Sequence, residues 1–304
     1  MNVRARASRS IALLGLSLAF AIVVVGSPPA AGLAVGDYWK YAYYQLDPGV
    51  EWFGNVTERF IGAGAGQNLI AFQLSGGGIL AGEANGTWSV FEQNNYRPTD
   101  GAYVSSNSTL ETSYRRLGQS FNVITATAIV DNPPVDFGGS LQVGSVSTAT
   151  TSETVTQTRT VNGVSGNPST QTATISLTQR VVARIEVTVP AGLFNALRIR
   201  LSRSDLPGYV EYAFNETVGN NVMVSVIDEF GSVSATLSLK EYRYNRAAVG
   251  GGAPSGLLAV PLLAIGATAA AVAVIVWRDR RRPPAIPVAP QQFNAGLGAP
   301  RNPP

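Results

Sequence analysis

Few residue types in this sequence could do chemistry. The 304 residues include no Cys and no His, which excludes thiol nucleophiles, Ser-His-Asp triads and Cys or His zinc sites. Paired carboxylates, or Ser with Lys, remain. Adjacent Asp228 and Glu229 would point to opposite faces of a strand, and no Ser-x-x-Lys motif contains Lys40 or Lys240. The sequence therefore predicts no catalytic, cofactor-binding or metal-binding residue, although a hydrolase built on carboxylates distant in sequence stays an open alternative.

Two further groups of residues could serve binding or modification. Sequons at four positions would accept carbohydrate on an exported chain: Asn55, Asn85, Asn107 and Asn215. Aromatic residues gather early in the chain and could stack on sugars or line an apolar pocket: Tyr38, Trp39, Tyr41 and Trp52. Packing within a sheet is the alternative role of these aromatic side chains. The segment 131–136, with two Asp and two Pro, lacks the spacing of a calcium loop and predicts a rigid turn.

The ends of the chain carry membrane signals. An apolar run at 11–25 follows three Arg and precedes small residues, so residues 1–32 are predicted to be a signal peptide, with an uncleaved N-terminal anchor as the alternative. Residues 257–277 carry no charge and are long enough to cross a bilayer. The arginines that follow indicate a cytoplasmic end: Arg278, Arg280, Arg281 and Arg282.

These signals divide the chain. Residues 33–245 are predicted to lie outside the cell, 246–256 to form a Gly-rich stalk, and the Pro-rich residues 278–304 to be a disordered cytoplasmic tail. Between residues 34 and 250 there are 14 Lys or Arg against 18 Asp or Glu, so the positive charge of the whole chain is terminal. The expected partner is therefore the lipid bilayer, with envelope proteins or glycans as further candidates, and a nucleic acid is not expected.

Two-residue alternation dominates the outer region. In residues 171–189 apolar side chains recur at odd positions and Thr, Arg and Glu at even ones, which indicates a long strand that must bend or carry a bulge. Thr at 154, 156, 158 and 160 predicts a Thr-lined hairpin with that strand. Ten further strands are predicted, at 37–45, 51–61, 68–74, 87–92, 102–115, 121–130, 197–202, 209–214, 222–227 and 233–244.

The predicted fold class is all-β: a large curved antiparallel sheet, a barrel, or a sandwich. Short echoes suggest an internal duplication with repeats at 33–140 and 141–245. They match residues 33–36 with 141–144, 68–75 with 195–202, and 110–115 with 240–243.

The plan as a whole resembles that of single-pass surface glycoproteins of archaea and some bacteria. The resemblance rests on the leader, the β-rich region, the Gly-rich stalk, the single span and the Arg cluster. Two short sequence segments, 35–41 and 189–194, add to it. It implies a cell-membrane protein with its N-terminal domain outside and an envelope-structural or interaction role. The alternative is a binding module for a lipid, an apolar ligand or an extended polymer.

Overall fold

The computed structural model describes residues 33–47, 49–63, 69–82, 85–97, 100–137 and 141–244, and these form an all-β structure. The strands are β1 (Tyr38–Asp47), β2 (Val50–Ala63), β3 (Ile70–Gly82), β4 (Asn85–Tyr96), β5 (Tyr103–Arg116), β6 (Gln119–Val135), β7 (Val146–Val161), β8 (Val164–Ser165), β9 (Ser169–Val189), β10 (Gly192–Arg203), β11 (Tyr209–Asn215), β12 (Asn220–Ile227) and β13 (Val233–Arg243). Each of the twelve strands expected from the sequence coincides with one of these, so the all-β prediction is confirmed.

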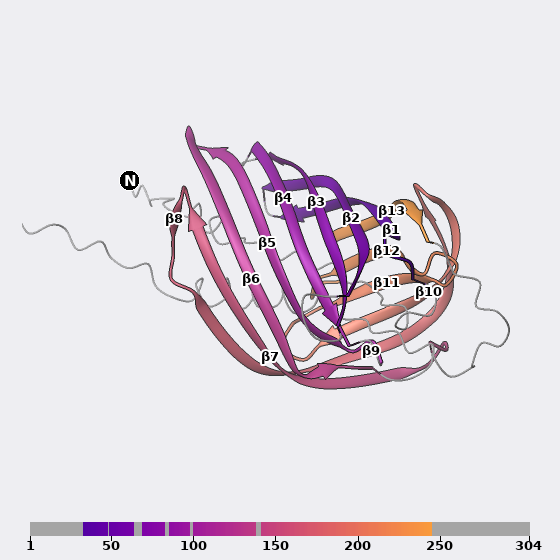
Figure 1. Ribbon diagram of the computed structural model, residues 1–304. Coiled ribbons are helices and arrows are strands. Elements are labelled where there is room, and N and C mark those ends of the chain that lie inside the picture. Colours follow the sequence, from indigo (N-terminus) through magenta and orange to yellow (C-terminus); the bar gives the residue numbers. More distant parts are fainter. Residues whose placement is uncertain are drawn as a thin grey trace, which may run out of the picture.

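The strands follow one another in space in the order of the chain. Every neighbouring pair is antiparallel, β6 pairs with β7, and β1 pairs with β13, which closes twelve strands into a barrel (Figure 1). The two-residue β8 lies outside this ring and pairs with β7 alone. Among the architectures that the sequence left open, the barrel is therefore the one formed, because the pairing of β1 with β13 joins the first and last of the twelve strands into one ring.

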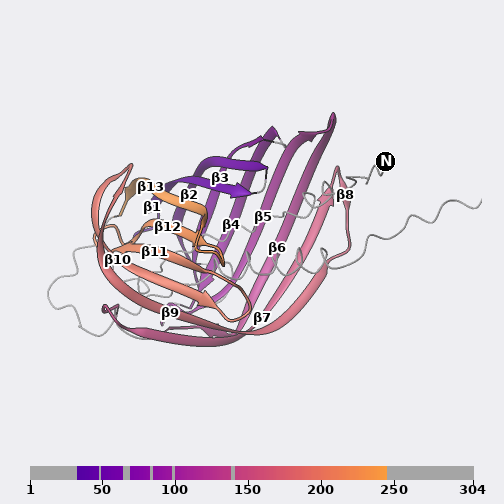
Figure 2. The ribbon, with the colours of Figure 1, turned by 180° about the vertical axis from the view of Figure 1, so that it is seen from behind.

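The barrel has two distinct ends. Tyr38 and Arg243, at the start of β1 and the end of β13, are register partners, so both ends of the barrel's chain lie together at what we call the terminal end. Since the strands alternate in direction, the turns after β1, β3, β5, β7, β10 and β12 lie at the opposite, distal end. The hairpin between β5 and β6 rises highest in both ribbon views (Figures 1 and 2).

The long strand expected at 171–189 is β9, which runs for 21 residues and bends beneath the barrel. Its register with β10 shifts between Arg198 and Ile199, where Val182 is the extra residue of the predicted bulge. The Thr-lined hairpin is also present. Hydroxyl groups pair across β7 and its neighbours at 3.0–3.4 Å, in the pairs Thr148–Thr178, Thr150–Ser176, Thr154–Thr172, Thr156–Thr170 and Thr160–Ser165.

One expectation about local structure was wrong. Residues 131–135, expected to be a turn, continue β6 as an irregular strand. Tyr103 pairs with Val135, whereas Ser105 already pairs with Val130, so four residues of β6 bulge out of register with β5. Proline cannot donate to the sheet, and the two prolines fall within this bulge, where no ladder hydrogen bond is required of them.

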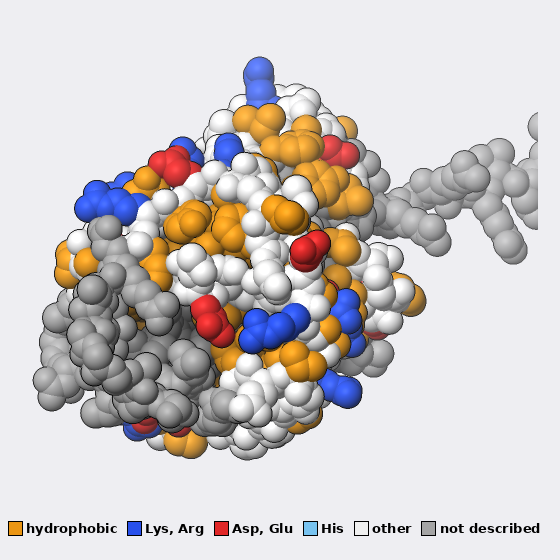
Figure 3. All heavy atoms as spheres, turned by 90° about the vertical axis from the view of Figure 1, so that its right-hand side faces the viewer, with side chains coloured by type: hydrophobic (Ala, Val, Ile, Leu, Met, Phe, Trp, Pro, Cys, Tyr) orange, Lys and Arg blue, Asp and Glu red, His pale blue; other side chains and the backbone are white. Residues whose placement is uncertain are grey.

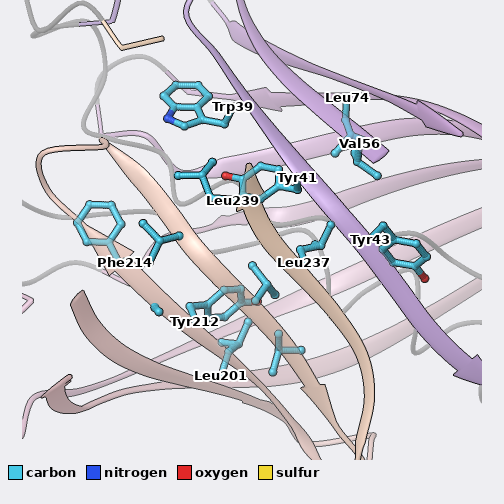
Figure 4. Close-up of a cluster of buried hydrophobic side chains, with 14 of the residues drawn as sticks. Trp39, Tyr41, Tyr43, Val56, Leu74, Leu201, Tyr212, Phe214, Leu237 and Leu239 are labelled. Carbon is cyan, nitrogen blue, oxygen red and sulfur yellow. The ribbon is translucent and has the colours of Figure 1, made fainter. Parts of the chain in front are cut away.

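The core fills the barrel with side chains from alternating positions. On β1, Trp39, Tyr41 and Tyr43 point inward and are at most 6% exposed, and they share one buried cluster with residues of β10, β11 and β13 (Figure 4). Burial of one large apolar side chain stabilises the folded state by about 1.5–3 kcal/mol. The inward-pointing apolar residues of each strand are therefore the main source of stability.

Glycines allow β2, β3 and β4 to approach closely. A Cβ on Gly78 would lie 1.7 Å from the carbonyl oxygen of Phe53, and one on Gly54 would lie 2.4 Å from the ring of Trp88. That ring covers Gly54, and its Nε1 donates to the Phe53 carbonyl at 3.1 Å. The Gly run of β3 therefore continues the strand, whereas the sequence pattern predicted that the strand would end before it.

Two turns repeat the same backbone geometry. The amide of Gly36 donates to Phe60 O, and that of Gly144 donates to Val181 O, at 3.0 and 2.9 Å. Both glycines have positive φ, 95° and 93°. Each turn precedes the first strand of a six-strand half, β1–β6 or β7 with β9–β13. The echo between 68–75 and 195–202 matches β3 with β10, and each of these is the third strand of its half. The echo between 110–115 and 240–243 matches β5 with β13, which are the fifth strand of one half and the sixth of the other, so they do not correspond.

Several predicted segments lie outside the described residues: the leader 1–32, the stalk 246–256, the span 257–277 and the tail 278–304. Within the described part of the chain, no helix is long and apolar enough to cross a membrane.

Candidate functional site

The barrel encloses polar side chains that its core does not require. Glu58 of β2 and Glu92 of β4 are both 0% exposed. Each is the register partner of Leu74 on the strand between them, so all three side chains lie in one row on the inner face. We call Glu58, Glu92, Asn94, Tyr96, Tyr212 and Asn220 the interior polar cluster.

Most polar atoms of this cluster lack a partner. Asn220 Nδ2 donates to Glu58 Oε2 at 2.8 Å. Glu58 Oε1, both carboxylate oxygens of Glu92, and the hydroxyls of Tyr96 and Tyr212 have no hydrogen-bond partner of good geometry among the described residues. A buried polar group without a partner costs about 1–3 kcal/mol, so a cluster of them indicates either a binding function or enclosed water.

Burial controls the ionisation of the two carboxyls. It raises the pKa of Glu58 to about 8, an increase that the amide of Asn220 partly offsets. The pKa of Glu92 is also raised to about 8, chiefly by burial; Asn94 lowers it and repulsion from Glu58 raises it further. Near neutral pH both groups therefore hold their protons to a large extent, and neither has a Lys or Arg among the groups that shift its pKa.

The turn between β11 and β12 closes the terminal end over this cluster. Trp39 Nε1 donates to Val218 O at 2.8 Å, and Tyr41 OH donates to Asn221 O at 3.1 Å. With the bond between Asn220 and Glu58, three side chains of β1 and β2 are tied to this one turn, which lies 162 to 180 residues later in the chain. This turn fixes the position of Asn220 and thereby the orientation of Glu58.

A second buried polar group lies on the β6, β7 and β10 side of the barrel. Arg203 forms two hydrogen bonds with Glu153, at 3.0 and 3.1 Å, and two with Asp205, both at 3.0 Å. Nearby, burial raises the pKa of Asp131 to about 7, with repulsion from Glu153 adding to the effect and Thr151 opposing it. Because the guanidinium is matched by carboxylates, this group serves the structure of the wall.

The four candidate aromatic residues do not share one surface. Trp39, Tyr41 and Trp52 are buried at 0, 2 and 4% exposure and point into the core. Tyr38 lies on the outer face, where its hydroxyl donates to Glu241 at 2.6 Å. The alternation along β1 therefore separates Tyr38 from the other three, which pack in the core, the alternative that the sequence left open.

The candidate sequons lie on the outside but in different environments. Asn55, Asn85 and Asn107 are exposed, and Asn55 Oδ1 accepts a hydrogen bond from Lys240 Nζ at 2.8 Å. Asn215 is half-buried, and its Nδ2 donates to Asn195 O at 2.7 Å, while its Oδ1 accepts from Val218 N at 3.0 Å. The topology residues Arg278, Arg280, Arg281 and Arg282 lie outside the described part of the chain.

The described residues contain no group of three or more Asp or Glu that could hold a metal ion. On the face shown in Figure 3, charged side chains of both signs are few and separated by uncharged ones, so that face carries no broad basic or acidic patch.

The strand pattern holds a signal for the interior polar cluster, although the sequence-based predictions do not include it. On β4, alternate residues point inward. Trp88, Val90 and Tyr96 are apolar residues at these positions, and Glu92 lies at one of the same positions. On β2, Glu58 falls between the inward residues Val56 and Phe60. A carboxylate in the apolar phase of a strand predicts a buried charge or a functional site, because such burial is costly without a partner.

The chain has only distant likeness to known proteins. No family profile matches the chain, and no curated protein matches it. A protein described as a lipoprotein from Parabacteroides distasonis is 12% identical over 70% of this chain and 100% of its own, with a TM-score of 0.30. A protein described as exported, with a YmcC-like fold, from Bacteroides fragilis is 11% identical over the same shares, with a TM-score of 0.29.

Proposed function

We propose that this chain is a membrane-anchored envelope protein that holds a closed β barrel outside the cytoplasm, in a structural or interaction role. The observation that supports it is the pairing of Tyr38 with Arg243. Because of this pairing, the segments that lead to the two apolar runs, at 11–25 and 257–277, leave the barrel at the same end. A single bilayer can therefore receive either run or both without the chain crossing the length of the barrel.

In this arrangement the distal end faces away from the membrane. Three of its turns carry exposed apolar side chains: Leu117 is 93% exposed, Val164 75% and Phe230 82%. Because these apolar side chains are exposed, the distal turns suit contact with a neighbouring envelope component better than contact with water alone.

The absence of cysteine makes the topology directly testable. Ser232→Cys places a single thiol in the exposed distal turn after β12, and Ala295→Cys places one in the tail. We expect a membrane-impermeant maleimide to label Ser232→Cys in intact cells and Ala295→Cys only after the cells are permeabilised. The opposite pattern, or labelling of both thiols in intact cells, would contradict the proposed orientation.

An internal binding function is the second candidate, and the unpartnered atoms of the interior polar cluster favour it. They favour a ligand with polar groups over a purely apolar one. We retain a non-enzymatic role, since a hydrolase needs one ionised carboxylate as base or nucleophile, whereas burial raises the pKa of both Glu58 and Glu92 to about 8, so both hold their protons near neutral pH.

A further inference from the structure

Among the residues that the structure describes, the two carboxyls of the interior polar cluster have no cationic partner. Glu58 faces Asn220 of β12, and its charge acts on Tyr41 of β1 and on Tyr96 of β4. Glu92 faces Asn94 and Glu58, and its charge acts on Tyr96 and on Tyr103 of β5. The one buried guanidinium of the described core, Arg203, is already held by Glu153 and Asp205.

Aromatic rings lie along the same part of the interior. Phe72 and Tyr96 meet edge to face at 5.6 Å between ring centroids, and Tyr96 and Tyr103 do so at 5.7 Å. Phe72 is the register partner of Asn94, one inward position along from the row of Glu58, Leu74 and Glu92. The carboxyls therefore lie next to aromatic rings, and the face of such a ring attracts cations.

Three features define the chemistry of a ligand for this cluster. Its acceptor atoms lack partners, the described residues place no cation beside it, and aromatic rings lie next to it. A neutral hydroxyl ligand would leave the repulsion between the two carboxylates in place once they ionise. An ammonium group supplies up to three donors and a compensating positive charge, and it can lie against an aromatic ring. A metal ion would need more ligands of the Asp or Glu type than the described residues bring together here.

We propose that the interior polar cluster binds a small aliphatic amine, whose ammonium group donates to the carboxylates of Glu58 and Glu92 and lies against the rings of Phe72 and Tyr96. The hydroxyls of Tyr96 and Tyr212 then accept or donate the remaining hydrogen bonds. This inference rests on the second candidate function, internal binding, and is independent of how the protein lies in the membrane.

Binding of a cation must displace protons from the carboxyls. Both have pKa values of about 8 in the free protein, whereas an aliphatic amine stays protonated to a pH of about 10. Between pH 6 and pH 8 the amine is thus charged throughout, while the carboxyls become easier to ionise. If one proton is released on binding, the affinity rises by about tenfold per pH unit in this range.

The test is calorimetric titration of the full-length protein in detergent, in phosphate buffer because Tris is itself an amine. The probes are 1,4-diaminobutane, butylamine and 1,4-butanediol, the last matching the diamine in length without its charges. We expect one or both amines to bind, about 100-fold more tightly at pH 8 than at pH 6 for one released proton, and the diol not to bind.

Matched variants localise the binding. Glu58→Gln with Glu92→Gln removes both charges at nearly constant shape and should abolish amine binding, and Tyr96→Phe should weaken it. Glu186→Gln, at an exposed position of β9, should leave it unchanged. Thermal melting of each variant shows whether it is folded.

Three results would overturn the amine site: no heat from either amine at pH 8, equal binding of the diol, or equal amine binding by Glu186→Gln and the double variant. The first would mean that the cluster holds water only. The maleimide labelling tests the proposed topology separately. A failed amine titration would therefore leave the membrane placement unaffected, and a failed labelling experiment would leave the amine site unaffected.

Discussion

Asn220 donates a hydrogen bond of 2.8 Å to the carboxylate of Glu58 across 162 residues of chain. It joins the turn that closes the terminal end to the second strand of the barrel. Both residues are fully buried, so removal of one leaves a buried polar atom of the other without its partner.

Asn220→Ala should therefore lower the free energy of unfolding by about 1–3 kcal/mol, the cost of leaving a buried acceptor without its donor. Urea unfolding followed by tryptophan fluorescence measures this, since Trp39 is tied to the same turn. Asn195→Ala, at an exposed position, is the matched control and should change stability little. Equal losses in the two variants would show that the bond contributes nothing specific.

Stability should fall as pH rises from about 5 to 8. The pKa values of Glu58 and Glu92 are raised from 4.5 to about 8, and that of Asp131 from 3.8 to about 7. In this window the unfolded chain ionises these groups while the folded chain retains their protons, so each pH unit favours unfolding, and the effect levels off above pH 8.

The measurement is the free energy of unfolding of the full chain at pH 5 and at pH 8. Combining Glu58→Gln with Glu92→Gln should flatten the dependence, because the neutral amides no longer titrate. Glu186→Gln should keep the slope of the original protein. A stability that increases from pH 5 to pH 8 would contradict the buried, protonated state of these carboxyls.

The close approach of β2 and β3 should not tolerate an added methyl group. Gly78→Ala would place a Cβ 1.7 Å from Phe53 O, an overlap with backbone that no rotamer change relieves. We expect a loss of about 3 kcal/mol or more in stability, above the usual cost of overpacking. Gly166→Ala, whose Cβ would lie 3.2 Å from its nearest neighbour, is the control and should change the melting temperature little.

The ion pair between Arg203 and Glu153 should show non-additive energetics. Their side chains are 4 and 5% exposed, so Arg203→Met leaves a buried carboxylate and should cost about 3–5 kcal/mol. Adding Glu153→Leu should restore much of that loss, because the double variant buries no unpaired charge from this pair. A double variant as unstable as the sum of the two single ones would show that the partners do not interact.

The sequons should differ in occupancy if the domain meets a glycosylation machinery. Asn55, Asn85 and Asn107 are exposed, whereas the amide nitrogen of Asn215 is engaged with Asn195 O. Peptide mass spectrometry of the native protein should therefore find glycan at one or more of the first three and none at Asn215. Modification at Asn215 alone would contradict this ranking.

Much of the fold followed from local pattern. The period of two gave twelve strands, and it also gave the inward phase of β9, where Ile175, Leu177 and Val181 are buried as the alternation indicates. The predictions that were wrong concern segments whose conformation depends on contacts with adjacent strands. The Gly run of β3 was expected to end the strand, and the prolines of β6 were expected to make a turn, because close approach and bulges depend on the adjacent strands.

What the sequence by itself determined is the strand content, the apolar face of each strand and the charged, apolar ends of the chain, because each of these is encoded within a few consecutive residues. Only the tertiary structure decided that β1 meets β13, and that Glu58, Glu92 and Asn220 share one interior. The physical reason is that barrel closure depends on the number and register of all strands together. Local periodicity fixes which way a side chain points, but not which distant side chain it meets.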